Sequence, residues 1–156
     1  MSRTYSILSL AVCFIICFSA AFFGGLFQPG DWYIQLTKPG WTPPNSVFGP
    51  VWTLLYTLMA ISAWLVWRKR GFTRASLTLS IFLLQLALNA LWSWIFFGLH
   101  RIGLAFAEIV VLWFTILATT ILFWRRAFIA GLLFLPYTLW VLFAALLNFY
   151  LWRMNP

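Results

Sequence analysis

The chain has 156 residues, of which 64% are hydrophobic and only 8% are charged, and 11 of them are tryptophans. A soluble domain of this length needs far more charge to cover its surface, so the composition excludes an ordinary soluble protein. Apolar runs of about twenty residues recur along the chain, and each is long enough to cross a bilayer. The sequence therefore predicts an all-α membrane protein with a single domain over residues 1–156.

The net charge of +8 is the one feature that could indicate nucleic-acid binding. The basic residues do not follow one face of a predicted helix. They cluster between the apolar runs, and that pattern is typical of membrane orientation. We therefore expect the lipid membrane as a partner and no nucleic acid.

Five transmembrane helices are predicted, in chain order at about residues 5–27, 46–67, 76–99, 102–124 and 128–152. No charge interrupts the first run, which at about 1.5 Å per residue extends about 34 Å. A signal peptide cleaved near Ser19–Ala21 is the alternative, but its apolar region would be shorter. We favour a retained helix.

Two cysteines, Cys13 and Cys17, lie in this first run. Residues four apart on one helix are poorly placed for a disulfide. No histidine or carboxylate stands near them to complete a metal shell. We interpret both as small residues of the membrane core and expect no metal site.

The loop 28–45 between the first two helices is predicted to be a lid. Four prolines, two glycines and three tryptophans lie within residues 32–52. Pro39, Pro43 and Pro44 forbid a continuous helix, because each lacks an N–H donor and fixes φ. A flexible spacer would be rich in Gly and Ser without Trp. A stiff aromatic loop is better suited to covering the mouth of a cavity.

Three of the predicted helices carry a polar and aromatic stripe, because residues three or four apart share a face. An amide in hydrocarbon needs a partner, so the stripes are expected to face the bundle interior. Aromatic walls with convergent amides are typical of a pocket for a flat, largely apolar molecule. The alternative is that the amides only join helix to helix. The stripes are Trp52 and Tyr56; Gln85, Asn89, Trp92 and Phe96; and Pro136, Trp140, Ala144 and Asn148.

Glu108 is the only carboxylate within an apolar run. An intramembrane acid can relay protons. A shallow carboxylate paired with Arg101 or Lys38 is the favoured interpretation. His100, the sole histidine, is interpreted as a polar turn residue rather than a haem ligand.

Leu147, Tyr150 and Arg153 satisfy the loose cholesterol-recognition pattern. Any leucine-rich helix that ends in Tyr and Arg at the interface fits that pattern, so we favour interfacial anchoring. No hydrolytic triad, paired carboxylates, phosphate-binding loop or metal-ligand spacing is visible. The sequence therefore predicts no catalytic residue.

The basic residues also predict an orientation. With five helices, the N-terminal side collects seven of the ten Lys and Arg residues, and the lid side collects Lys38, Arg101 and Arg153. This bias places the N-terminus in the cytoplasm if the host is a bacterial inner membrane. Other host membranes stay open.

Several long motifs resemble the translocator protein and tryptophan-rich sensory protein (TspO/MBR) family, which includes the peripheral-type benzodiazepine receptor. They are Trp32–Tyr33, Lys38–Pro44 and Gly49–Trp52; Gln85–Trp92 with Phe96–Gly98; and Pro136–Trp140 with Asn148 and Trp152–Arg153. The resemblance covers nearly the whole chain. It implies a five-helix bundle that binds porphyrins such as protoporphyrin IX and haem, together with synthetic isoquinoline carboxamides and benzodiazepines. It also implies homodimers and no obligatory cofactor.

The resemblance implies a ligand-binding set by matching motif position. The set is Trp41, Pro43, Pro44, Trp52, Tyr56, Asn89, Trp92, Trp140 and Ala144, joined by Tyr33. We hypothesise that a planar macrocycle stacks against Trp52 and Trp140 while Asn89 donates to a carboxylate or carbonyl. The segment Trp41–Pro44 would close the open end.

Three functions are compatible with the resemblance. The first is a receptor or sensor that regulates tetrapyrrole and stress responses. The second is a transporter of porphyrin or sterol, which the lack of inverted repeats disfavours. The third is an enzyme that breaks down porphyrin in light.

Overall fold

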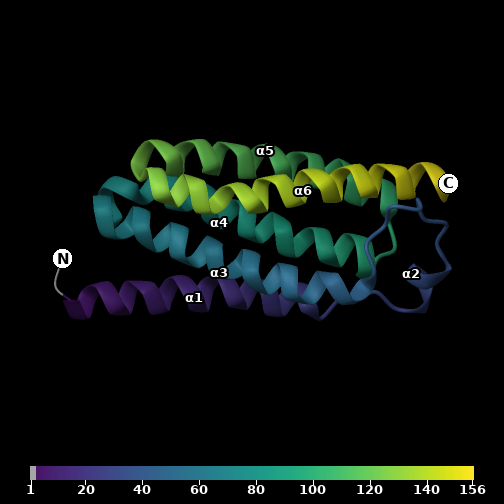
Figure 1. Ribbon diagram of the computed structural model, residues 1–156, viewed down its shortest axis with the longest axis horizontal. Coiled ribbons are helices and arrows are strands. Elements are labelled where there is room, and N and C mark those ends of the chain that lie inside the picture. The colour runs from purple at the N-terminus through teal and green to yellow at the C-terminus, as the bar shows by residue number, and fades with distance from the viewer. Residues whose placement is uncertain (1–2) are drawn as a thin grey trace.

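The computed structural model describes residues 3–156, and five of its spans are long and apolar enough to cross a membrane. The predicted all-α membrane fold is confirmed. The spans lie side by side along one axis, and the first span begins at the opposite end of the bundle from the end at which the last span finishes (Figure 1). They are α1 (Arg3–Gly25), α3 (Asn45–Arg70), α4 (Phe72–Ser93) with the π-helical turn η1 (Trp94–Gly98), α5 (Ile102–Arg126) and α6 (Phe128–Met154).

The lid loop between α1 and α3 covers the end of the bundle at which α6 finishes (Figure 1). The sequence predicts a stiff loop here that no continuous helix crosses, and within it the structure has one short helix, α2 (Asp31–Gln35). Pro29 precedes α2 and the other prolines of the loop follow it, so no proline lies within α2 to forbid a helical turn. We call this end of the bundle the lid end and the opposite one the inner end.

The helix boundaries differ from prediction mainly at the inner end. Helix α3 runs three residues beyond the predicted Trp67, through the basic cluster, because one glycine suffices to end it. Gly71 has φ 74°, a left-handed conformation that favours glycine, and its N–H donates to the Trp67 carbonyl. The last-turn residues Arg68, Lys69 and Arg70 favourably oppose the negative end of the helix dipole.

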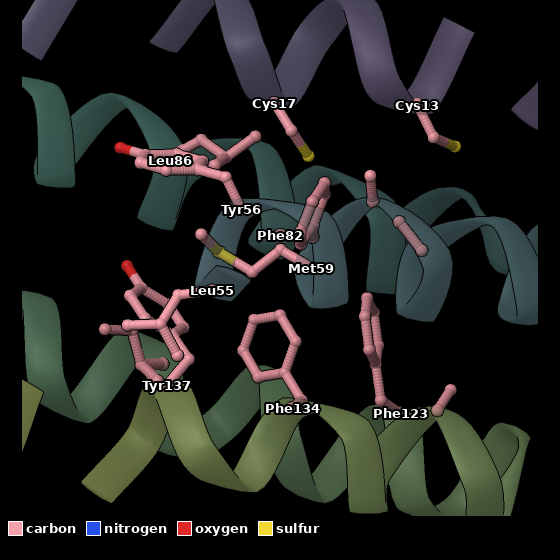
Figure 2. Close-up of a cluster of buried hydrophobic side chains, with 14 of the residues drawn as sticks. Cys13, Cys17, Leu55, Tyr56, Met59, Phe82, Leu86, Phe123, Phe134 and Tyr137 are labelled. Carbon is pink, nitrogen blue, oxygen red and sulfur yellow. The ribbon is translucent and has the colours of Figure 1, made fainter. Parts of the chain in front are cut away.

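Aromatic rings fill the inner half of the bundle (Figure 2). Phe82 of α4, Phe123 of α5 and Phe134 of α6 form a triangle with ring centroids 5.6, 5.1 and 6.1 Å apart. Met59 of α3 is fully buried in the same cluster. The predicted core residue Cys17 reaches this cluster from α1 as a free, buried thiol.

Backbone contacts in the inner half are also close. A Cβ added to Gly131 of α6 would lie 2.6 Å from the Cα of Trp124 on α5. No L side chain fits there without a shift of the backbone. This half of the molecule is therefore packed to the point at which one methyl group is too much.

Candidate functional site

The lid-end half contains a cavity of about 850 Å³. Its walls come from α1, α3, α4 with η1, and α6, and two residues of α5 complete them. The start of the lid contributes Gln28, Pro29 and Tyr33. This volume lies in the range of small-molecule sites in proteins.

Most of the predicted ligand-binding residues are brought together here. They come from three different helices and from the start of the lid, so only the fold unites them. The cavity is lined by Tyr33, Trp52, Tyr56, Asn89, Trp92, Trp140 and Ala144. Their contact with a ligand stays a prediction.

Trp41, Pro43 and Pro44 are not among the residues that line the cavity. The Trp41 ring packs instead on the outer side of α6, with centroids 5.7 Å from Phe143 and 5.6 Å from Tyr150. Its side chain is 46% exposed. The expected closure by Trp41–Pro44 is therefore not the geometry of this structure.

Sequence reasoning missed the wall that α1 supplies. Phe18 and Phe22 line the cavity together with Ala21, Gly24 and Gly25, and Phe27 joins them just after the helix ends. Helix α1 carries a few hydroxyl residues but no amide and no tryptophan, so it lacked the signals that marked the inward faces of the other helices. The small-residue run near its end was the one available hint.

The two principal tryptophans stand on different walls. Trp52 of α3 contacts Tyr137 at 6.2 Å, and Trp140 of α6 contacts Phe48 at 6.2 Å, both edge to face. No ring contact joins Trp52 to Trp140 among residues 3–156. Space for a guest therefore separates two aromatic surfaces.

A chain of hydrogen bonds closes the cavity floor. Tyr56 Oη donates to Asn89 Oδ1 at 2.7 Å, and Asn89 Nδ2 donates to Tyr137 Oη at 2.8 Å. Tyr137 Oη donates in turn to Gln85 Oε1 at 2.8 Å. We call these four residues the floor network, and it ties α3, α4 and α6 together. Asn89 keeps one amide hydrogen that a ligand could accept.

The amide of Asn148, on the predicted stripe of α6, has a structural role. Trp92 Nε1 donates to Asn148 Oδ1 at 3.0 Å, and Asn148 Nδ2 donates to the Ile102 carbonyl at 3.0 Å. These bonds join α4, α5 and α6. For Asn148 and Gln85, the helix-joining interpretation accounts for the amide.

The lid is anchored by its aromatic residues. Tyr33 is 3% exposed and packs against Phe96 and Phe97, with Lys38 Nζ 4.7 Å from its ring centroid. Burial raises the pKa of the Tyr33 hydroxyl above its usual value. Trp32 stacks on His100 at 4.1 Å. His100 is thus a turn residue, as predicted.

The C-terminal tail holds the lid from the other side. Asn155 Oδ1 accepts from the Thr37 N–H at 3.0 Å, and Asn155 Nδ2 donates to the Thr37 carbonyl at 2.9 Å. The same amide also reaches the Leu151 carbonyl. We call this contact the Asn155 clasp. It joins residues 118 positions apart, and no local pattern could predict it.

The sterol-motif residues do not share one surface. Leu147 lines the cavity and is buried, whereas Tyr150 is 46% exposed on the outside of α6. Arg153 is exposed in the last turn of the helix. Sterol binding by these three residues stays a prediction.

Glu108 differs from the sequence-based interpretation. Both of its carboxyl oxygens are buried and have no hydrogen-bond partner within residues 3–156. Its expected partner Lys38 donates instead to the Ile34 and Leu36 carbonyls, at 3.0 and 3.1 Å. The predicted ion pair is therefore wrong, because lid carbonyls hold the lysine at the bundle end.

The cavity itself carries no ionisable charge. None of the residues that line it is Lys, Arg, His, Asp or Glu. Its polar groups are hydroxyls, amides and indole N–H groups. Such a lining suits a largely neutral guest, and it leaves any acidic group of a ligand without a cationic partner inside.

Comparison with known proteins gives a consistent result. A sequence model described as the TspO/MBR family matches residues 12–153. Protein CrtK of Rhodobacter capsulatus is 44% identical, over 97% of this chain and 95% of that protein. The tryptophan-rich sensory protein of Cereibacter sphaeroides is 40% identical over 89% and 86%, respectively. Human translocator protein is 39% identical over 86% and 82%.

Proposed function

This chain belongs to the TspO/MBR family of membrane sensors and receptors, and we propose that it binds a porphyrin in the lid-end cavity. The bound state would signal tetrapyrrole supply or stress. The observation that carries the proposal is the cavity itself: about 850 Å³, free of charged side chains, with Trp52 and Trp140 on separate walls. Aromatic faces of this kind stack well on a planar macrocycle.

The polar groups of the cavity suggest how the ligand is oriented. Asn89 offers one free amide hydrogen, and no protein acceptor is assigned to the indole N–H of Trp52 or Trp140 in the described chain. These donors suit ring nitrogens or carbonyl oxygens. Because the lining has no cation, the porphyrin carboxylates would stay at the mouth, beside Gln28 and Asn45.

The test is a titration with protoporphyrin IX that follows quenching of tryptophan fluorescence. We expect Trp140→Ala to weaken the affinity by about tenfold or more, because it removes one stacking wall. Trp124→Ala is the matched control, since Trp124 lies outside the cavity and is 40% exposed. Equal affinities in the two variants would overturn the proposed site.

Two other activities stay predictions. Light-driven breakdown would use Trp52 or Trp140 beside an excited ring, and product spectra after illumination of the bound porphyrin would reveal it. Transport of porphyrin or sterol would appear as flux across sealed proteoliposomes. Homodimer formation and a cytoplasmic N-terminus in a bacterial inner membrane likewise stay predictions.

A further inference from the structure

Glu108 lies beside the cavity wall without forming part of its lining. It follows the start of α5 by six residues, which places it about 9 Å along the helix. The next residue, Ile109, and Leu112 one turn later both line the cavity. Glu108 therefore lies on the turn of α5 that contributes to the cavity wall.

No hydrogen-bond donor stabilises an ionised form of the Glu108 carboxyl group in the described chain. Both oxygens are buried and accept no hydrogen bond in the described chain. The hydroxyls that share its helix face, Thr115 and Thr119, donate to carbonyls of their own helix. An ionised carboxylate in such a place is strongly disfavoured, whereas the protonated acid is tolerated.

The elements packed against α5 supply no cation at this depth. Helix α4 carries only Arg74, near its inner end, and η1 carries no ionisable residue. The other ionisable groups on these helices are Tyr56, Arg68, Lys69 and Arg70 of α3; Arg125 and Arg126 of α5; and Tyr137, Tyr150 and Arg153 of α6. Arg101 immediately precedes α5 and forms no ion pair with Glu108 in residues 3–156.

One of these groups, on the helix packed against α5, belongs to the cavity floor. The Tyr137 hydroxyl is a member of the floor network, and its helix α6 packs against α5, which carries Glu108. Like Glu108, it is neutral when protonated and offers no positive charge. The charge state of Glu108 would therefore reach the cavity through the turn of α5 that carries Ile109 and Leu112.

We propose that Glu108 is a proton-binding site within the membrane: a neutral acid at neutral pH whose ionisation weakens the binding of an anionic ligand. On ionisation the O–H bond breaks, the proton passes to solvent and the negative charge stays on the carboxylate. The coupling to the ligand rests on the proposed porphyrin binding. At an effective dielectric of about 20, two like charges within about 12 Å of each other lower the affinity by about tenfold or more.

Infrared spectroscopy tests the protonation state without any ligand. The chain has two Asp and Glu residues in all, Asp31 and Glu108, so the acid carbonyl band can be assigned by substitution. We expect the band at neutral pH in the wild type and in Asp31→Asn, and its loss in Glu108→Gln. Asp31→Asn alone assigns the band, even if Glu108→Gln fails to fold. A wild type that shows only carboxylate bands at neutral pH would overturn the proposal.

A pH series with protoporphyrin IX tests the coupling. We expect the wild type and Asp31→Asn to lose about tenfold in affinity as the acid band disappears, beyond any change in Glu108→Gln. An identical pH dependence in Glu108→Gln would overturn the coupling. If no variant binds the porphyrin, the proposed function fails, while the infrared titration still decides whether Glu108 holds a proton.

Discussion

Aromatic side chains fill the inner half of the bundle, whereas in the lid-end half they line a cavity. In the inner half, rings from α4, α5 and α6 meet one another at the axis (Figure 2). In the lid-end half, Trp52 and Trp140 stand on separate walls around a cavity of about 850 Å³. Aromatic content alone therefore does not indicate a packed core. What decides is whether the rings meet one another, as in the inner half, or stand on separate walls of a cavity, as in the lid-end half.

The floor network marks the boundary between the halves. Asn89 and Tyr56 face the cavity, while Tyr137 and Gln85 are fully buried behind them. Every bond in this network crosses from one helix to another. It can therefore hold the helices apart at the cavity and together below it.

The largest effect should come from the filled half. Phe134→Ala removes the ring that contacts both Phe82 and Phe123, and it should lower the free energy of unfolding by about 3–5 kcal/mol. Trp140→Ala removes a larger side chain from a wall that already faces empty space, so its cost should be clearly smaller. Denaturant unfolding in detergent measures both. Equal losses would remove the distinction between the halves.

The second-largest loss of stability should come from a substitution in the floor network, at the boundary between the two halves. Tyr137→Phe leaves an Asn89 N–H and the Gln85 carbonyl without their partner, which should cost about 1–3 kcal/mol. The exposed Tyr150 provides the control, because Tyr150→Phe removes a hydroxyl at the surface. If the two variants unfold alike, the floor network does not hold the helices.

Two glycine substitutions compare the halves directly. Gly131→Ala would force its Cβ against the Trp124 backbone and should destabilise by about 1–3 kcal/mol. Gly49→Ala meets nothing within 4 Å and should be neutral or slightly stabilising, since Ala favours the helix. The same unfolding assay ranks them. If Gly131→Ala left the free energy of unfolding unchanged, the inner half would be packed less tightly than the 2.6 Å distance at Gly131 indicates.

The smallest effect concerns the lid. Asn155→Ala removes the clasp on Thr37, whose exposed bonds should contribute only about 1 kcal/mol together. Global unfolding should hardly change, but amide hydrogen exchange at Thr37 should accelerate. Met154→Ala is the neighbouring control. Unchanged exchange at Thr37 would mean that the aromatic anchors alone fix the lid.

The fold could be predicted because long apolar runs leave a membrane chain few alternatives. Much of the cavity could be predicted as well, since Trp52, Asn89 and Trp140 mark inward faces at helical spacing. The α1 wall could not, because Phe18 and Phe22 lie on a helix without the amides and tryptophans that marked the inward faces of the other helices.

Contacts between segments far apart in the chain could not be predicted from the sequence either. The Asn155 clasp depends on where α6 ends relative to the lid, which no local pattern encodes. The position of Trp41 on α6 has the same origin, and so does the unpaired state of Glu108. In each case the residue type was informative, but its partner was decided by the way the helices pack.

The most direct test of the account fills the cavity without disturbing the packed half. Ala144→Phe places a ring inside the lid-end cavity, and Ala107→Phe places the same ring on the exposed face of α5 as the control. The account predicts that Ala144→Phe loses about tenfold or more of the affinity for protoporphyrin IX while its unfolding midpoint stays near that of Ala107→Phe. An unchanged affinity in Ala144→Phe, with the protein folded, would contradict it.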